Sequence, residues 1–522
     1  MKAGSLMMRL VACVFALVLG TSSAAFADAT SDTNAKIDAL QKQLDAVKAQ
    51  LDILKAQKAA PPPAAAPASG NSFLMLKKGD PFTLIVGGSE EVTLYGNLDI
   101  SFDLATKGLS KFYPSSGDSP TGAVGYQPDI STNLSFIGVR GAHKLPHSKL
   151  TVPYQLETQL DISQTAGTPN SNSANDSVVK GALTSRNSYV GIASPYFGAF
   201  KIGKTDAPYK TSTARMNPFS SMIGDYSAVM GNTGGDNRVE FLTRLDHAVW
   251  YESPNWGGFT FNALATTGQN RAFDNGIIPS GQTSCAGGNV PGSGAGIPQC
   301  NDGSYGTVVS SNIAYQKKKL YLTAAYEIHK GVNRTGDLPA YDPGDVADEQ
   351  AMKYGVQYGF GRGTTVSAIY ENFKRYVPAR LQYQNERQRD GYWLALSQAL
   401  SADNTFNIGW AHANATPGDA PQHNTPAAGA NPDNAANMYT AMIRHTLDKH
   451  FSLYAGYAMT LNHPAAHYDL GAGGRGVTTD CHDGSNLTAF DPTVNPPVSG
   501  AGPHCYAGGL LRAFSAGLNL KF

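Results

Sequence analysis

The feature that most constrains this chain is an alternation of apolar and polar residues that recurs from about residue 92 to the end. In the stretch VTLYGNLDISFDL, residues 92–104, Val92 and Leu94 are apolar while Thr93 and Tyr95 belong to the polar parity. Side chains of a β-strand point alternately to its two faces, so a period of two predicts a two-faced strand. No helical period appears after about residue 88, and the alternation predicts an all-β fold there.

About sixteen stretches carry this pattern, and an even number of antiparallel strands suits a closed bacterial barrel. The predicted strands are 92–104, 134–141, 150–162, 186–193, 199–205, 246–253, 258–266, 307–315, 319–330, 351–360, 364–374, 391–399, 404–412, 437–446, 451–462 and 512–522.

The connections between these strands alternate between short turns and long polar segments. Short turns such as GRG, SADN and LDKH contain Gly, Asn or Asp, which are typical turn residues. The long segments lie near 105–133, 163–185, 206–245, 267–306, 331–350, 375–390, 413–436 and 463–512. Short turns at one rim and long loops at the other are typical of outer-membrane barrels.

Two-faced strands also occur in β-sandwiches, where the polar face meets bulk water. Strands of about 9–13 residues exceed the usual five or six and match a tilted membrane crossing. Only 15% of the residues are charged, against about 25% in an average globular chain. We therefore expect a membrane barrel whose last strand pairs with the first, because an unpaired strand edge in hydrocarbon is too costly.

The first 27 residues read as a secretory signal. Lys2 and Arg9 precede the apolar run LVACVFALVLG, and Ala25-Phe26-Ala27 supplies a small-x-small cleavage site. We expect cleavage after Ala27 and export. A lipoprotein box ending at Cys13 is the less favoured alternative, because little apolar sequence precedes it. The mature chain has no run of about 18 apolar residues, so no transmembrane helix is predicted.

Residues 28–57 are predicted to form a short α-helical coiled-coil segment in the periplasm, followed by a Pro/Ala-rich linker over 58–87. Apolar residues recur there at steps of three and four, as in a heptad seam, which hints at an oligomer. An amphipathic helix folding back on its own chain is the alternative. The seam residues are Ile37, Leu40, Leu44, Val47, Leu51 and Leu54.

Four cysteines remain after signal cleavage, in two pairs, Cys285/Cys300 and Cys481/Cys505. An even count in an exported chain favours two disulfides. His482 and His504 beside the second pair leave a zinc site as the less favoured alternative, since the spacing lacks a short C-x₂₋₄-C element.

Peptide mapping of the purified protein checks this pairing. We expect the peptides carrying Cys285 and Cys300 to migrate together without reductant, likewise those carrying Cys481 and Cys505, and both pairs to separate after reduction. Free thiols in the oxidised preparation would contradict the expectation.

The barrel region, from about 88 to 522, resembles the trimeric Gram-negative general porins, especially those of neisserial type. The segments that carry the resemblance are VTLYGNLDIS, LSFIGVRGAHKL with LTVPYQLET, SRNSYVGIASPYFGAFKIGKTDAPY, RLDHAVWYESPNWGGFTFNA and AFSAGLNLKF. The resemblance implies a homotrimer of 16-stranded antiparallel transmembrane β-barrels in the outer membrane. Each would form a water-filled channel for passive diffusion of ions and small hydrophilic solutes. It also implies contact with lipid and lipopolysaccharide, and a terminal Phe522 that the barrel-assembly machinery reads.

The same resemblance implies that the third long loop, 206–238, folds inward and constricts the pore. By position, Asp225 and Asp236 match the acidic side of such a constriction, with Lys204 and Arg244 facing Asp225 across the pore. The matching basic wall positions are Arg140, Lys204, Arg238 and Arg244. Two departures bear on the field across the pore: Trp250 stands where relatives often carry arginine, and Arg215 adds a cation to the loop.

No enzymatic signature accompanies the barrel pattern: the mature sequence contains no G-x-S-x-G, H-E-x-x-H or phosphate-binding loop. His329 has the polar parity of its strand and is expected to be an ordinary lumen residue. We expect no metal or cofactor, and 40 basic against 40 acidic residues give no basic face for nucleic acid. The alternatives are a substrate-specific channel for a sugar or small organic anion, a barrel enzyme, and a tether or adhesin whose coil contacts the cell wall or a periplasmic partner.

Overall fold

The computed structural model divides into two compact units, residues 1–71 and 72–522, and the residues it describes belong to the second. The predictions of a signal peptide over 1–27 and of a coiled coil with its seam over 28–57 lie outside the described residues. The described residues are 74–77, 80–87, 90–106, 125–160, 162–163, 186–231, 241–242, 244–267, 307–333, 346–379, 382, 385, 388–417, 433–463, 466, 468–471 and 509–522.

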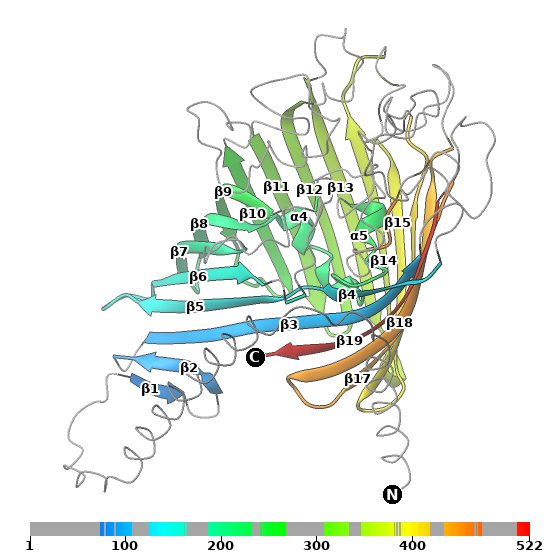
Figure 1. Ribbon diagram of the computed structural model, residues 1–522. Coiled ribbons are helices and arrows are strands. Elements are labelled where there is room, and N and C mark those ends of the chain that lie inside the picture. Colours follow the sequence, from blue (N-terminus) through cyan, green and yellow to red (C-terminus); the bar gives the residue numbers. More distant parts are fainter. Residues whose placement is uncertain are drawn as a thin grey trace, which may run out of the picture. The chain divides into compact units, whose positions relative to one another are not determined.

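Nearly all of this structure is antiparallel β-sheet (Figure 1). The strands are β1 Leu74–Lys77, β2 Asp80–Val86, β3 Glu90–Thr106, β4 Gln127–Thr132, β5 Phe136–Lys144, β6 Thr151–Gln159, β7 Ser188–Ser194, β8 Gly198–Asp206, β9 Arg244–Glu252, β10 Phe259–Thr267, β11 Thr307–Lys317, β12 Leu320–Asn333, β13 Val346–Gly359, β14 Thr364–Arg375, β15 Asp390–Ala399, β16 Asn404–Ala413, β17 Ala436–Thr446, β18 Phe451–Asn462 and β19 Leu510–Lys521.

The helical elements are short. They are α4 Pro208–Thr211, η2 Ala214–Met216, α5 Ser227–Met230 and η4 Gly361–Gly363. Within the described part of the chain, no helix combines the length and the apolar character needed to span a bilayer.

The sheet closes into a ring. Each strand from β5 to β19 pairs antiparallel with the next, and β19 pairs with β3, placing Phe514 opposite Leu104 and Lys521 opposite Asn97. Both β4 and β5 pair with β3, so they form two segments of one crossing, and the ring has sixteen crossings. The predicted closed 16-stranded antiparallel barrel is confirmed. In Figure 1 the red β19 lies beside the blue β3 at this seam.

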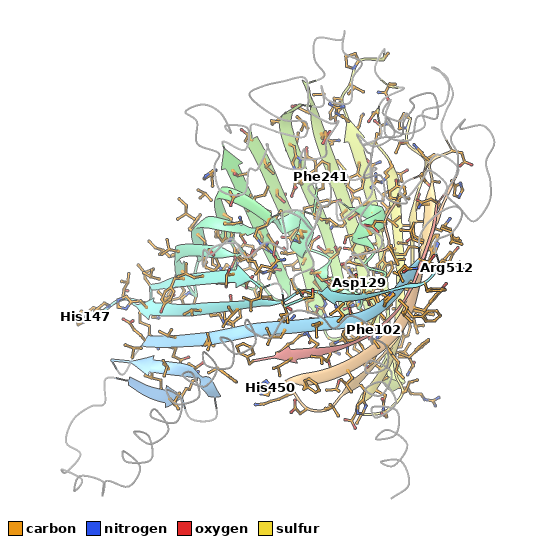
Figure 2. All side chains as sticks on the ribbon, in the orientation of Figure 1. Phe102, Asp129, His147, Phe241, His450 and Arg512 are labelled. Carbon is orange, nitrogen blue, oxygen red and sulfur yellow. The ribbon has the colours of Figure 1, made fainter. Side chains whose placement is uncertain are left out.

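The two faces of the wall differ as the alternation predicts. Directly paired residues share a face, so each face can be followed around the ring: Phe102 pairs with Ala516, and Ala516 pairs with Ala455. On one face large apolar side chains are exposed, among them Phe102, Phe200, Ile202, Ile313, Tyr354, Leu394 and Phe514. The opposite, interior face carries polar residues such as Asp99, Glu157, Asn312, Lys353 and Asn407. Figure 2 shows all described side chains on this ribbon, with Phe102 labelled. An apolar outside and a polar inside are what a lipid-embedded barrel requires.

The structure corrects the C-terminal part of the linker predicted over 58–87, whose residues before 74 lie outside the described part of the chain. Strand β1 pairs with β2, and residues 83–86 of β2 pair with residues 90–93 of β3. This stretch of β3 extends beyond Asn97, the partner of Lys521 at the end of β19, so its edge has no partner in the C-terminal strand. The run FTLIV therefore adopts a strand, because it completes that edge.

The strand predicted over 134–141 is also longer than expected. The crossing starts at Gln127, inside the long loop predicted over 105–133, and breaks between Thr132 and Phe136. At the break, the Asn133 side-chain amide donates to Asp99 Oδ1 at 3.1 Å and to the Tyr454 hydroxyl at 2.7 Å. Those bonds hold the kink that joins β4 to β5.

The C-terminal residue is held by the seam. Phe522 N donates to the Gly96 carbonyl at 3.2 Å, and Gly96 N donates to the Phe522 carbonyl at 3.0 Å. The Phe522 ring lies 5.4 Å from that of Phe82 in β2 and covers Gly96, where an added Cβ would lie 2.5 Å from the ring. A terminal phenylalanine thus fills a place that only glycine leaves open. Its reading by the assembly machinery stays a prediction.

Replacing Gly96 with alanine is expected to destabilise the seam by about 1–3 kcal/mol, the usual cost of overpacking. The new Cβ would meet the Phe522 ring and also the Phe136 carbonyl oxygen at 2.9 Å, which cannot rotate away. The melting temperature of the barrel in detergent, followed by circular dichroism, measures the effect. Gly361→Ala is the matched control, because a Cβ there meets nothing within 4 Å. Equal melting of the two variants would contradict this account.

Candidate functional site

The connection between β8 and β9 is the third long one, and its continuous described stretch, residues 207–231, is here called the inner segment. The inner segment packs against the interior face of the wall. Tyr209 N donates to Ser310 Oγ of β11 at 3.0 Å, near the start of the segment. Further along, Trp393 Nε1 of β15 donates to the Met216 carbonyl at 3.1 Å. Thr440 Oγ1 of β17 donates to the Gly224 carbonyl at 3.3 Å. The inner segment therefore follows the interior wall from β11 to β17.

Apolar packing fixes the inner segment more firmly than these single hydrogen bonds. The Phe219 ring stands edge-on to Trp393 with centroids 6.0 Å apart, and Tyr226 lies 5.2 Å from the same indole. Met216, Phe219, Ile223 and Met230 are fully buried. Each such side chain contributes about 1.5–3 kcal/mol when it leaves water, so the segment is anchored along its length.

Asp225 holds the inner segment in shape from within. Its Oδ1 accepts hydrogen bonds from Asn217 Nδ2 at 2.8 Å and from Ser227 N and Oγ at 3.0 and 2.6 Å. Its Oδ2 accepts from Ser221 N at 2.7 Å, and the residue is 6% exposed. A buried carboxylate with four donors from its own loop does not fit the predicted place facing Lys204 and Arg244 across the pore.

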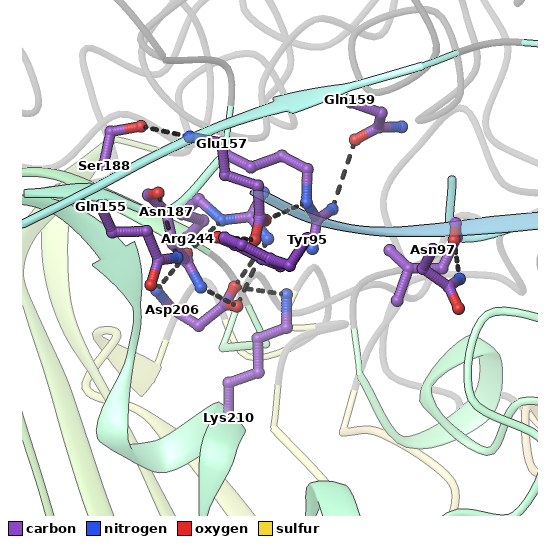
Figure 3. A network of polar contacts seen from close by, with 12 residues as sticks. Tyr95, Asn97, Gln155, Glu157, Gln159, Asn187, Ser188, Asp206, Lys210 and Arg244 are labelled. Atoms are coloured by element: carbon purple, nitrogen blue, oxygen red, sulfur yellow. Dashed lines mark hydrogen bonds and ion pairs between the residues drawn. The ribbon is translucent and has the colours of Figure 1, made fainter. Parts of the chain in front are cut away.

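Arg244 and Lys204 are each paired with other carboxylates. Arg244 Nη2 lies 3.1 Å from Asp206 Oδ1, and Lys204 Nζ lies 3.1 Å from Asp246 Oδ1. Asp206 also pairs with Lys210 at 2.9 Å, at the start of the inner segment. Figure 3 shows Asp206 between Arg244 and Lys210. These contacts clamp the base of the inner segment to the wall.

A second group of polar contacts lies next to this clamp (Figure 3). Tyr95 donates from its hydroxyl to Glu157 Oε2 at 2.9 Å, and Arg186 Nε donates to Glu157 Oε1 at 2.5 Å. The Arg140 guanidinium lies over the Tyr95 ring, 4.7 Å from its centroid. The structure thus brings the predicted wall residues Arg140 and Arg244 into one region, in which Arg186 joins them.

Arg186 was not predicted as a site residue, although it is the first residue of the strand predicted over 186–193; in the structure it precedes β7. Trp250, the predicted departure, lies on the interior face, donates from Nε1 to Glu252 Oε1 at 2.9 Å and stands edge-on to Tyr189. The predicted Asp236 and Arg238, and the cysteines Cys285, Cys300, Cys481 and Cys505, lie outside the described residues.

Three buried acid–base pairs lie on the interior face of β12–β14. Lys353 Nζ is 3.2 Å from Glu371 Oε1, and both side chains are fully buried. The Lys353 ammonium also lies 4.1 Å from the centroid of Tyr209, which belongs to the inner segment. The other two pairs are Arg375–Glu349 at 3.1 Å and His329–Glu327 at 2.9 Å. The inner segment therefore packs over paired charges as well as over apolar side chains.

The phenols of the inner segment stay protonated. Burial raises the pKa of Tyr209 and of Tyr226, and the negative charge of Glu371 raises both further. Tyr226 shares a hydrogen bond of 2.9 Å with Thr213 Oγ1 inside the segment. At neutral pH these side chains therefore act as uncharged packing and hydrogen-bonding groups.

Acidic residues also lie on the interior face of β3, where sequence reasoning assigned no site. Asp99 accepts hydrogen bonds from the Tyr454 hydroxyl at 2.6 Å, Asn133 Nδ2 at 3.1 Å and Asn519 Nδ2 at 2.9 Å. Asp103 accepts from Ser131 Oγ at 2.5 Å. Among the residues with described positions, no group of three or more His, Cys, Asp or Glu is arranged to hold a metal ion.

A closed barrel with a polar interior and a segment packed inside it can be compared with known proteins. The family model for Gram-negative porins matches residues 56–464. The chain belongs to the Gram-negative porin family. This porin is accordingly an outer-membrane channel protein built on a transmembrane β-barrel.

Solved structures are similar to this porin at low sequence identity. The anion-selective porin from Comamonas acidovorans is 17% identical, has a TM-score of 0.52, and is aligned over 83% of this chain and 100% of its own. The trimer form of OmpT from Vibrio cholerae is 14% identical, with a TM-score of 0.45 and coverage of 83% and 99%. OmpF from Salmonella typhi, in complex with daunomycin, is 13% identical, with a TM-score of 0.46 and coverage of 83% and 98%. A search of curated protein sequences finds no match.

Replacing Asp225 with alanine is expected to loosen the inner segment while the barrel wall stays intact. The change leaves four donors without their acceptor, and each lost acceptor costs about 1–3 kcal/mol if its donor stays buried. Hydrogen–deuterium exchange in detergent should show faster exchange of the amides of residues 217–227, with unchanged protection in β12–β14. Ser220→Ala, at an exposed position of the same segment, is the control. Unchanged protection around residue 225 would refute the role assigned to the carboxylate.

Proposed function

We propose that this porin forms a water-filled channel for passive diffusion of ions and small hydrophilic solutes, with the inner segment as its constriction. The observation that carries the proposal is the attachment of residues 207–231 to the interior wall from β11 to β17. A segment held on one side of the lumen narrows the passage without closing the rest of it. The remaining wall, from β3 to β8, supplies polar and charged side chains toward that passage.

The mechanism requires no covalent step. A hydrated solute avoids the cost of entering about 30 Å of hydrocarbon because the wall keeps it in water. Exposed polar side chains offer contacts that are weak enough to exchange, and pore width and lining charge set the selectivity. Arg140 and Arg215 are exposed charged residues of the interior that are suited to such contacts.

The partners proposed for this porin follow from its outer face and its family. The exposed apolar belt is suited to outer-membrane lipid and lipopolysaccharide, and we propose a homotrimer, with Phe522 as the signal for the barrel-assembly machinery. We also propose that residues 1–27 are a signal peptide. The coil of residues 28–57 would lie in the periplasm, where it forms a bundle in the trimer or contacts the cell wall. Asp236 and Arg238 stay proposed members of the constriction.

Planar-bilayer recording and liposome swelling with the mature full-length protein test the channel. We expect stepwise, long-lived conductance, and swelling rates that fall with the size of a neutral sugar irrespective of its identity. Size dependence is the expected result because a constriction built from packed side chains discriminates first by width.

Bilayers that take up the protein but pass no current would overturn the proposal. Swelling that depends on which sugar or small organic anion is supplied, at equal size, would instead favour a substrate-specific channel. Heat-denatured protein reconstituted in the same way serves as the control for leakage through the lipid.

A further inference from the structure

We propose that Arg215 forms an anion-binding subsite on the inner segment and makes this pore favour small anions over cations. The inference rests on the proposed function and adds the solute class to it. The ligand chemistry is that of a small hydrated anion, such as chloride or a short carboxylate, in transit through the lumen.

The Arg215 guanidinium is exposed and is positioned by neutral groups. Its Nε donates to Gln357 Oε1 at 3.0 Å and its Nη1 to Gln316 Oε1 at 2.5 Å, while the group lies 4.5 Å from the centroid of Tyr321. Across the described ranges, no carboxylate lies within ion-pair distance of it. The positive charge of Arg215 is therefore held in place without being neutralised.

The residues that hold Arg215 are themselves fixed. Gln357 Nε2 donates back to the Arg215 carbonyl at 3.2 Å and to Ser367 Oγ at 2.9 Å. The Tyr321 hydroxyl donates to the Ser212 carbonyl at 2.8 Å. A guanidinium pre-positioned in this way loses little side-chain entropy when an anion approaches its remaining N–H groups.

The acids of the inner segment and of the strand end that precedes it do not offset this charge. Asp225 is buried under four hydrogen bonds from its own loop, and Asp206 is paired with both Arg244 and Lys210. Among residues 207–231 the charged groups toward solvent are thus cationic. Over residues 207–231, the part of this loop that carries the argument, the side facing the pore is therefore basic, where the resemblance to general porins implied an acidic side.

Two cationic residues of the barrel wall add to the positive charge that Arg215 brings to the pore lining. Arg140 is exposed and lies over Tyr95, and Arg444 donates to Ser452 Oγ at 3.1 Å and lies over Tyr454. Within the part of the chain that the structure describes, neither has a carboxylate within ion-pair distance. The wall acid Asp99, by contrast, is 4% exposed and accepts from three side chains.

These cations share one level of the barrel. Arg140 lies four residues before the end of β5 and Arg444 two residues before the end of β17. Gln316 and Gln357, which hold Arg215, lie one and two residues before the ends of β11 and β13. All therefore lie within about 13 Å, along a strand, of the short turns. A solute that leaves or enters by this rim therefore meets the exposed cations Arg140 and Arg215, with the half-buried Arg444 at the same level.

The reversal potential across a KCl gradient tests the inference. We expect the native porin to favour chloride over potassium at 0.1 M, and the preference to shrink at 1 M, because salt screens exposed charges. Arg215→Gln should lower the chloride-to-potassium permeability ratio by about five- to tenfold at 0.1 M, because one unit charge about 5 Å from an ion in water favours chloride and disfavours potassium by up to about fourfold each before salt screening. Arg215→Glu should lower it further, and Arg215→Lys should keep most of it.

Lys317→Gln is the matched control, since Lys317 lies at the same level of β11, next to Gln316, but is an exposed residue of the outer face. A native pore that favours potassium would overturn the inference, as would an Arg215→Gln ratio equal to that of Lys317→Gln. Heat-modifiability on gels shows whether each variant is folded, and the salt dependence of the native pore tests the idea even if Arg215→Gln does not fold. Absence of any native conductance would refute the channel itself, which is a separate outcome.

Discussion

A membrane-embedded backbone has to satisfy its own hydrogen bonds, and the rest of this structure depends on that constraint. Lipid offers neither donors nor acceptors, so an open strand edge costs several kcal/mol for each unpaired group. The ring of sixteen crossings meets the requirement by pairing β19 with β3. Where β3 extends past the C-terminus, β2 takes over the edge, and Phe522 bonds to Gly96 at the junction. Strands β19 and β2 thus pair with successive stretches of the same edge of β3, and together they close the barrel.

The closed wall creates an interior in which charges have to be managed. Some are neutralised in pairs beneath the inner segment, as with Lys353 and Glu371, and others clamp its base, as Asp206 does between Arg244 and Lys210. Arg215, Arg140 and Arg444 contact only neutral side chains among the described residues. Structural and solute-facing charges are therefore separated within one lumen, and this separation is the basis for the proposed preference for anions.

Much of the fold could be predicted from the sequence, because the alternation of period two directly reports which side chains face lipid. It predicted the number of crossings, the closure of the last strand on the first, and the interior face that carries His329. It missed β4, where Pro128 interrupts the pattern, and the hairpin β1–β2, whose neighbours are rich in Ala and Pro. Such short strands are fixed by the edge they cover, which is a property of the assembled sheet.

The site could be predicted less well, because a linear pattern places a charge on a face without naming its partner. Position alone suggested that Asp225 faces the pore, whereas four donors from its own loop bury it. In the same way, the resemblance to general porins put Lys204 and Arg244 among the candidates, but their partners, Asp246 and Asp206, follow only from the register. Arg186 lies at the start of the strand predicted over 186–193, but nothing in the alternation indicates that its guanidinium pairs with Glu157.

The fully buried pair of Lys353 and Glu371 has a consequence for how this sequence can drift over time. Losing one partner leaves an uncompensated charge in a dry environment, at a cost of about 3–5 kcal/mol, whereas exchanging both for apolar residues of similar volume is often neutral. Selection therefore acts on the two positions jointly. Positions 353 and 371 lie opposite each other on neighbouring strands, and in sequences that descend from this one they are expected to change together.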